Sequence, residues 1–231
     1  IDLIFLERSL NWIAHHKAYS PDRPFFLYHA MQAPHCPVLP AEQFRGATDG
    51  GPYGDFVAEI DWIVGRLLEV AESDTSRDTL VIFTSDNGPE THAIRRKKET
   101  GHDSAFSLRG LKRDNWEGGH RVPFVAKWAA SFAPGHTCRD PICLSDLAAT
   151  CAALTGQVVP AGEAEDSYSI LDALFGSSYE TPLRPPILHN SFTGEHGVRR
   201  GRWKLLDHRG PGSGNYRKAP IEPPLSDPDA P

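Results

Sequence analysis

A short hydrophobic run covers residues 79–84, Thr-Leu-Val-Ile-Phe-Thr, and it ends in the polar sequence Ser-Asp-Asn-Gly. The run has the length and the β-branched composition of a strand. It is apolar on both faces, as is typical of a strand in a parallel sheet that helices cover. Ligands of open α/β sheets bind just beyond the carboxyl ends of the strands, which is where Asp86 and Asn87 fall. The pattern therefore predicts a buried strand with a polar site at its end.

Two helices and a second strand are predicted before this run. Apolar residues between Ile4 and Ile13 recur at helical spacing, and the pattern ends near residues 15–17. Residues 25–30, Phe-Phe-Leu-Tyr-His-Ala, are a second candidate for a buried strand. Residues 53–71 carry apolar side chains at three- and four-residue steps, the pattern of an amphipathic helix. This order of elements predicts a βαβ unit with parallel strands.

The remainder of the chain predicts shorter elements. We expect a long polar loop at 88–120, a third strand at 121–128, and a helix that Ser145 caps and Gly156 ends. Residues 157–186 are typical of a connection, with one or two helical turns at 169–175, and residues 186–191 and 198–207 are expected to be antiparallel strands. The predicted fold is α/β: a mixed, largely parallel sheet sandwiched by helices in residues 1–156, then a linker and a small antiparallel α+β subdomain in 157–231.

Asp86 and Asn87 are candidate metal ligands. Adjacent carboxylate and amide oxygens are hard donors, which suit Ca²⁺ or Mg²⁺. Asp-Asn-Gly also favours a tight turn, because Asn tolerates positive φ and Gly adopts it readily, so a turn without a metal remains the alternative. His35 lies just past the strand predicted at 25–30, in the same relative place as Asp86. Imidazole at that place makes His35 a second candidate for chemistry.

Composition excludes several classes of function. A net charge of −6 over 231 residues argues against a broad nucleic-acid surface, and the basic run at 95–98 is typical of a solvated loop. No stretch approaches the 18 apolar residues of a membrane span. Residues 210–214 have the glycines of a phosphate loop but lack the Lys-Ser/Thr that would follow. The four cysteines are too few for a disulfide scaffold. A Cys138–Cys143 pair, or a zinc site that these two form with His136, is the alternative, although the spacing fits no standard finger, and we expect free thiols at Cys36, Cys138, Cys143 and Cys151.

Four stretches in order resemble the type I sulfatases, the formylglycine-dependent arylsulfatases of the alkaline phosphatase superfamily. They are Pro-Phe-Phe-Leu-Tyr through Ala-Pro-His (24–35), Thr-Ser-Asp-Asn-Gly (84–88), Leu-Arg-Gly-Leu-Lys (108–112) and Glu-Gly-Gly-His-Arg-Val-Pro (117–123). The resemblance covers nearly the whole chain. It implies an alkaline phosphatase-like α/β fold and hydrolysis of sulfate esters. It also implies a formylglycine nucleophile, made from cysteine or serine, and a Ca²⁺ ion, with Mg²⁺ as the less expected metal.

The resemblance also implies roles for single residues. Asp86 and Asn87 match metal ligands, and Lys112 and His35 match catalytic residues that contact the sulfate. Their chemistry agrees with these roles, since a metal, an ammonium and an imidazole stabilise the charge of a sulfate ester in its transition state. His102, in the long loop where substrates are often contacted, is a further candidate for substrate binding. A structural role is expected for Glu117, Gly118, Gly119 and Arg121, with charged hydrogen bonds from Glu117 and Arg121 holding the loop.

The nucleophile motif of the family, Cys/Ser-x-Pro/Ala-x-Arg, matches no cysteine or serine of this chain, and the first metal aspartates are absent too. Both elements precede this region in the family, so we expect the chain to be the C-terminal part of a longer sulfatase. By itself it should not turn over substrate and should bind Ca²⁺ with millimolar rather than micromolar affinity. A periplasmic, secreted or lysosomal location is expected by resemblance only.

Two other functions remain open. A phosphodiester or phosphonate ester hydrolase of the same superfamily is the first, although such enzymes typically pair Asp with His at the second metal site, where this chain has Asn87. A non-catalytic relative that keeps the fold is the second. The expected partner is a small-molecule or carbohydrate sulfate ester, and steroid, phenolic and carbohydrate sulfates are all compatible with the sequence.

Overall fold

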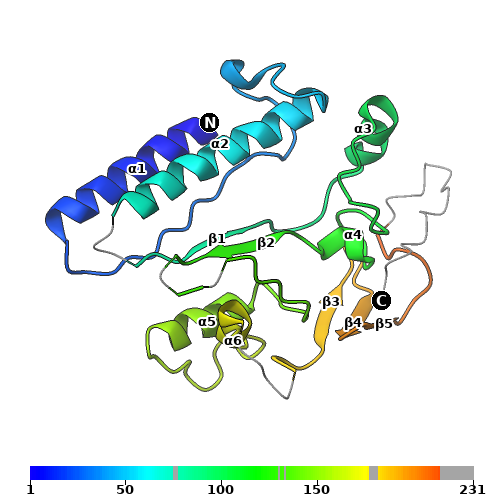
Figure 1. Ribbon diagram of the computed structural model, residues 1–231. Coiled ribbons are helices and arrows are strands. Elements are labelled where there is room, and N and C mark those ends of the chain that lie inside the picture. Colours follow the sequence, from blue (N-terminus) through cyan, green and yellow to red (C-terminus); the bar gives the residue numbers. More distant parts are fainter. Residues whose placement is uncertain (75–77, 130, 133, 177–181, 214–231) are drawn as a thin grey trace. The chain divides into compact units, whose positions relative to one another are not determined.

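The structure is a computed structural model that describes residues 1–74, 78–129, 131–132, 134–176 and 182–213 (Figure 1). Its contacts divide the chain into two compact units. The first contains Ile1–Val81 and Lys98–His102, and the second contains Ile82–Lys97 and the chain from Asp103 onward. No helix in the described part of the chain combines the length and the apolar character that a membrane crossing requires.

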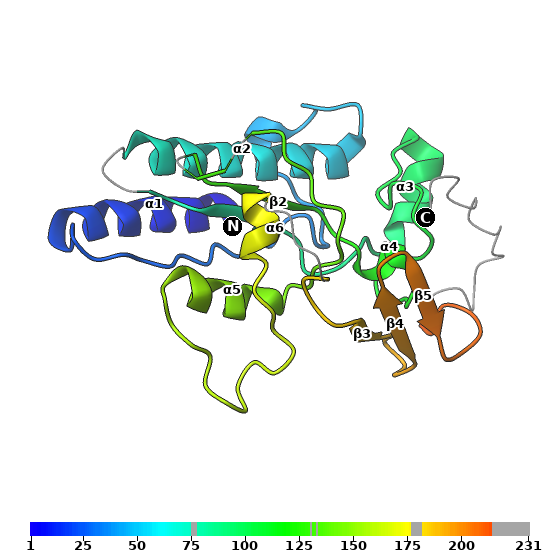
Figure 2. The ribbon, with the colours of Figure 1, turned by 60° about the horizontal axis from the view of Figure 1, so that its bottom comes forward.

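Two long helices, α1 (Asp2–Tyr19) and α2 (Gly51–Ser73), lie side by side in the first unit (Figures 1 and 2). Both confirm the predicted helical periodicity. Burial of their apolar stripes stabilises the pair, and the most buried apolar side chains are those of Leu6, Ile13, Phe56, Ile60 and Ile63. A 3₁₀ turn, η1 (Glu42–Phe44), lies in the segment between the helices.

The strand predicted at residues 25–30 is not formed. No described strand pairs with this segment, and a strand needs a hydrogen-bonded partner. Alternate side chains contact α1: the rings of Trp12 and Phe25 are 5.4 Å apart, and Ser9 Oγ lies 2.9 Å from His29 Nδ1. Phe26 and Tyr28, on the other side, are exposed. The segment is therefore extended and covered on one side only, and the predicted parallel βαβ unit is absent from the described residues.

The second unit contains two small sheets. One pairs β1 (Val81–Thr84), whose first residue belongs to the other unit, with β2 (Phe124–Lys127). The other has the order β3 (Ile187–Asn190), β4 (His196–Arg200), β5 (Trp203–Leu206), and both pairs are antiparallel. The antiparallel C-terminal sheet confirms the prediction, but residues 198–207 form parts of two strands, because a turn at 201–202 reverses the chain.

Four short helices belong wholly or mostly to this unit. They are α3 (His92–Thr100), α4 (Glu117–His120), α5 (Asp146–Leu154) and α6 (Leu171–Phe175). The prediction of one continuous loop at 88–120 is thus wrong, since this region contains α3 and α4. Ser145 holds the N-cap position of α5 without a capping side-chain bond; the carboxylate of buried Asp146 instead accepts the Cys143 N–H at 2.7 Å.

Candidate functional site

Asp86 and Asn87 follow the end of β1 directly, as the sequence predicts. Asp86 is exposed, and the Asn87 side-chain amide donates a hydrogen bond to Asp86 Oδ1 at 3.1 Å. This bond fixes the two side chains against each other and leaves the amide oxygen of Asn87 and the second carboxylate oxygen of Asp86 for a cation. The pair fits a hard divalent ion, although Ca²⁺ takes six to eight oxygen ligands. Among the described residues, no group of three or more His, Cys, Asp or Glu could complete such a site.

Close contact between glycine backbones holds the chain just after this pair. The Gly88 N–H donates to the Gly119 carbonyl at 3.0 Å, and the Gly118 N–H donates to the Arg109 carbonyl at 2.7 Å. A Cβ on Gly88 would overlap the carbonyl oxygen of Gly118, and a Cβ on Gly118 would overlap that of Gly110. Only glycine permits three backbone segments to approach so closely. We call Gly88, Gly110, Gly118 and Gly119 the glycine cluster.

Lys112 belongs to the same backbone arrangement. Its N–H donates to the Pro89 carbonyl at 2.8 Å, so the segment that carries Lys112 is tied to the chain two residues after Asn87. The next residue, Arg113, forms two 2.7 Å hydrogen bonds with the carboxylate of Glu90. Burial raises the pKa of Glu90, but the Thr91 amide and the Arg113 guanidinium outweigh it and leave the pKa below its ordinary value. Backbone hydrogen bonds within the second unit therefore join the segment of Asp86 and Asn87 to the segment of Lys112.

His35 and His102 both belong to the first unit. His35 is exposed, and its Nδ1–H donates to the Cys36 carbonyl at 2.7 Å, which leaves Nε2 for a ligand. The loop before it is held by buried Asp2, whose carboxylate accepts the N–H groups of Gln32 at 2.7 Å and Ala33 at 3.0 Å. His102 is exposed, and its ring lies 5.8 Å from that of Tyr53.

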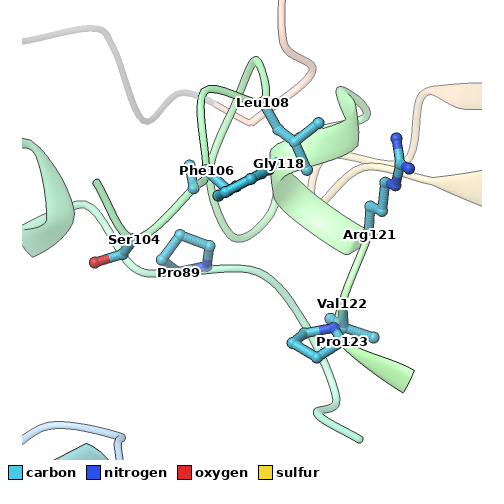
Figure 3. A pocket seen from close by; sticks show the side chains of 9 residues that line it. Pro89, Ser104, Phe106, Leu108, Gly118, Arg121, Val122 and Pro123 are labelled. Carbon is cyan, nitrogen blue, oxygen red and sulfur yellow. The ribbon is translucent and has the colours of Figure 1, made fainter. Parts of the chain in front are cut away.

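A shallow cavity of about 260 Å³ lies beside the glycine cluster (Figure 3). Its lining is mostly apolar and includes Pro89, Phe106, Leu108, Gly118 and Pro123. Arg121 contributes to the wall, and its guanidinium extends alongside α4, away from Pro89 and Pro123. The structure thus places Arg121 at a cavity wall, whereas the sequence interpretation expected its side chain to hold the loop through hydrogen bonds.

Glu117 at the start of α4 forms the expected charged hydrogen bonds, with partners from the C-terminal sheet. Its Oε2 accepts from Arg199 Nη1 at 2.8 Å, and its Oε1 accepts from Lys204 Nζ at 2.8 Å. Burial raises the pKa of Glu117, but the cations of Lys204 and Arg199 outweigh it and hold the pKa below its ordinary value. Sequence reasoning did not single out the side chains of Arg199 and Lys204, because nothing local in the sequence indicates a partner so far along the chain.

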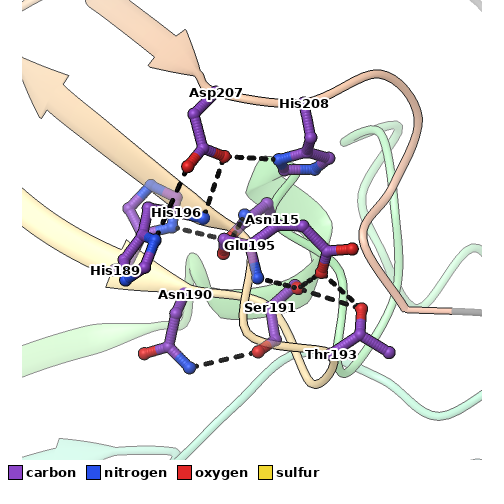
Figure 4. Close-up of polar contacts among 9 residues, drawn as sticks. All are labelled: Asn115, His189, Asn190, Ser191, Thr193, Glu195, His196, Asp207 and His208. Atoms are coloured by element: carbon purple, nitrogen blue, oxygen red, sulfur yellow. Dashed lines mark hydrogen bonds and ion pairs between the residues drawn. The ribbon is translucent and has the colours of Figure 1, made fainter.

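Two histidines lie next to this group of charges. His120 Nε2 is 2.7 Å from Lys204 Nζ, and the rings of His120 and His189 are 4.3 Å apart. His189 Nδ1 contacts Asn115 Oδ1 at 3.0 Å, as Figure 4 shows, and Asn115 Nδ2 donates to the Glu195 carbonyl at 2.7 Å. Burial and then the nearby cationic groups lower the pKa of His120, and they lower the pKa of His189 to about 4. Both rings are therefore neutral at pH 7.

The chain is similar to known proteins over most of its length. The family model described as Sulfatase matches residues 1–157. The chain belongs to the sulfatase family. The N-acetylgalactosamine-6-O-sulfatase of Bacteroides thetaiotaomicron is 31% identical over 88% of this chain and 40% of its own. The human N-acetylgalactosamine-6-sulfatase is 33% identical over 87% of this chain and 38% of its own, and human arylsulfatase A is 35% identical over 81% and 36%.

Solved structures confirm the α/β fold class of this sulfatase chain. A chain from work on glycosaminoglycan metabolism by Bacteroides thetaiotaomicron has a TM-score of 0.79 and 31% identity, with 91% of this chain and 44% of that chain covered. Ps i-CgsB, in complex with k-i-k-neocarrahexaose, has a TM-score of 0.73 and 27% identity, with 90% and 46% covered. The sulfatase chain thus spans less than half of the proteins it matches here.

Proposed function

We propose that the protein containing this chain hydrolyses sulfate esters, with Asp86 and Asn87 as ligands of a Ca²⁺ ion. The observation that carries the proposal is the fixed Asp86–Asn87 pair, which the glycine cluster joins to the segment of Lys112 within one unit. The membership of the chain in the sulfatase family supports the same reaction. When bound, the ion would supply positive charge next to the sulfate oxygens.

The side chains of this chain have distinct roles in the proposed reaction. The ammonium of Lys112 binds a non-bridging sulfate oxygen and stabilises the charge that grows there in the transition state. His35 binds the sulfate ester and gives a proton from Nε2 to the leaving oxygen, because an alkoxide leaves poorly without one. The nucleophile of the proposal is a formylglycine supplied by sequence that precedes Ile1. His102 remains a proposed substrate contact.

The proposed substrate is a sulfated carbohydrate. Two of the relatives are named as N-acetylgalactosamine 6-sulfatases, and each matches more than four fifths of this chain. The mouse steryl-sulfatase is 36% identical but matches only 68% of the chain. A steroid substrate is therefore supported over a smaller part of the chain than a carbohydrate substrate. A periplasmic, secreted or lysosomal location belongs to the same proposal.

The test uses the full-length protein, produced together with a formylglycine-generating enzyme. We expect turnover of 4-nitrophenyl sulfate and of N-acetylgalactosamine 6-sulfate, and much slower turnover of 4-nitrophenyl phosphate. Asp86→Ala and Lys112→Ala should each lower kcat/KM by about 10²-fold or more, as removal of one stabilising group typically does. Asp49→Ala and Lys98→Ala, at exposed positions outside the proposed site, are the matched controls.

The outcomes separate the three readings. Faster turnover of the phosphate ester than of the sulfate ester would favour the alternative superfamily hydrolase. A correctly modified protein that hydrolyses neither ester would support the non-catalytic relative. If kcat/KM falls equally in the variants and in their controls, Asp86 and Lys112 do not belong to the active site.

A further inference from the structure

The C-terminal sheet presents two cations to α4 from directly opposite positions. Arg199 on β4 and Lys204 on β5 are cross-strand partners in the antiparallel register. Like charges in this position repel each other and destabilise a sheet. The carboxylate of Glu117 removes this conflict, because it accepts a 2.8 Å hydrogen bond from each cation. The sheet and α4 are therefore stabilised together by one partly buried carboxylate.

Partial burial makes these contacts stronger than an ion pair on the surface. The side chains of Arg199, Lys204 and Glu117 are 20%, 15% and 23% exposed. At such sites the effective dielectric constant is lower than in water, so each attraction is larger and its loss leaves a charge that is poorly solvated. Lys204 Nζ also lies 2.7 Å from His120 Nε2, which in turn lies 3.2 Å from the Asn115 carbonyl oxygen.

The two residues that follow Glu117 carry the contacts to the site. The Gly119 carbonyl accepts from the Gly88 N–H, and the Gly118 N–H donates to the Arg109 carbonyl. Gly88 directly follows Asn87, and the segment of Arg109 continues to Lys112. A shift of α4 would move the Gly119 carbonyl away from the Gly88 N–H. The glycine cluster has no side chains that could fill the resulting gap.

We propose that Arg199 and Lys204 are positioning residues, which act through Glu117 and α4 to hold the Asp86–Asn87 pair and Lys112 in their catalytic geometry. The inference depends on the proposed function of those three residues. It gives Arg199 and Lys204 of the C-terminal sheet a role in the reaction through their contacts with Glu117. A displacement of about 1 Å at a catalytic group can cost up to about 10²-fold in rate, so loss of one cation should be visible in turnover.

The experiment compares cations of β4 and β5 in the full-length, modified enzyme. Lys204→Met and Arg199→Met each remove one charged partner of Glu117 and leave an unbranched apolar side chain in its place. Arg200→Met is the matched control, because Arg200 follows Arg199 on β4, is exposed and lies on the opposite face. Lys204→Arg is the conservative variant. We would measure kcat, KM, the Ca²⁺ concentration that gives half-maximal turnover, and Tm.

We expect Lys204→Met to lower kcat about tenfold and to raise the half-maximal Ca²⁺ concentration, with a smaller change in KM for the sulfate ester. Lys204→Arg should recover most of both losses, and Arg200→Met should match the wild type. A role in stability alone would lower Tm while the folded enzyme kept the wild-type kcat and Ca²⁺ dependence, and this result would overturn the inference. An inactive, correctly modified wild type would instead overturn the proposed function, and the inference with it.

Discussion

Carboxylates with low exposure hold segments of both units, but their partners differ. In the first unit Asp2 accepts the backbone N–H groups of Gln32 and Ala33, just before His35. Glu59 similarly accepts the N–H of Ala41 at 2.8 Å. In the second unit Glu117 accepts from two cationic side chains of a distant sheet. The same chemical group thus fixes a nearby loop in one unit and joins segments far apart in the sequence in the other.

Because their partners differ, the two regions should respond differently to substitution. A backbone amide carries no net charge, so the hydrogen bonds of Asp2 and Glu59 do not bring a cation next to either acid. The contacts of Glu117 depend also on its cations and on the neighbouring rings of His120 and His189, whose pKa values lie below the ordinary value. We therefore expect the first unit to respond mainly to the loss of a hydrogen-bond acceptor. The second should respond to steric change, pH and charge.

Gly88→Ala should have the largest effect, because it breaks the backbone contact on which the second unit depends. The added Cβ would overlap the carbonyl oxygen of Gly118, which is backbone and cannot rotate away. We expect a loss of about 3 kcal/mol in the free energy of unfolding, at the upper end of overpacking effects. Equilibrium urea denaturation measures the change, and sulfatase turnover should be lost with it.

Gly65→Ala is the control for this substitution. Gly65 lies within α2, and a Cβ there would meet nothing within 4 Å. Alanine at such a helical position should stabilise the protein by about 0.5–1 kcal/mol. If Gly88→Ala lowers the free energy of unfolding no more than a typical surface substitution does, the glycine cluster accommodates a side chain. The proposed role of its backbone contacts would then be wrong.

Asp2→Ala should have the second largest effect and tests the carboxylate–amide contacts of the first unit. It leaves the Gln32 and Ala33 N–H groups without their acceptor, and an unsatisfied buried donor costs about 1–3 kcal/mol. We expect a total loss of about 2 kcal/mol, with Asp2→Asn losing less because its amide oxygen still accepts one bond. Tm and hydrogen exchange at the two amides measure the effect.

Exposed Asp22 supplies the control for Asp2. Asp22→Ala should change stability by no more than about 0.5 kcal/mol, as is usual for surface substitutions. Unchanged exchange protection of Gln32 and Ala33 in Asp2→Ala would contradict the role assigned to this carboxylate.

Local sequence patterns predict the elements that hydrophobic periodicity builds. The apolar stripes of α1 and α2 and the β-branched run of β1 each identify their element, and Asp86 and Asn87 are found from their position after that run. Helix α3 is missed because its sequence, His-Ala-Ile-Arg-Arg-Lys-Lys-Glu-Thr, has almost no apolar face. Its helical tendency comes from long charged side chains, which lose little rotamer freedom in a helix.

Contacts between distant segments are not predictable in the same way. Glu117 is 82 residues from Arg199 and 87 residues from Lys204 in the sequence, and nothing local connects them. The opposite error occurs at residues 25–30, whose β-forming composition predicts a strand that has no partner among the described strands. In both places contacts with residues far away in the sequence decide the local structure, and a local sequence pattern does not show these contacts.

Replacement of His189 should change stability least, through the pH dependence of the free energy of unfolding. His189 faces His120, Lys204, Glu117 and Arg199, and burial lowers its pKa from about 6.5 to about 4. Between these values the unfolded chain binds more protons than the folded one, so stability is lost as the pH falls from about 6.5 to about 4. Because the ring is only half-buried, solvent reduces the effect to about 1 kcal/mol.

His189→Gln should lose this part of the pH dependence, whereas His15→Gln, at an exposed position of α1, should keep it. Urea denaturation at pH 7, 5.5 and 4.5 measures the difference. Equal pH dependence in both variants would mean that His189 accepts a proton without cost to the free energy of unfolding.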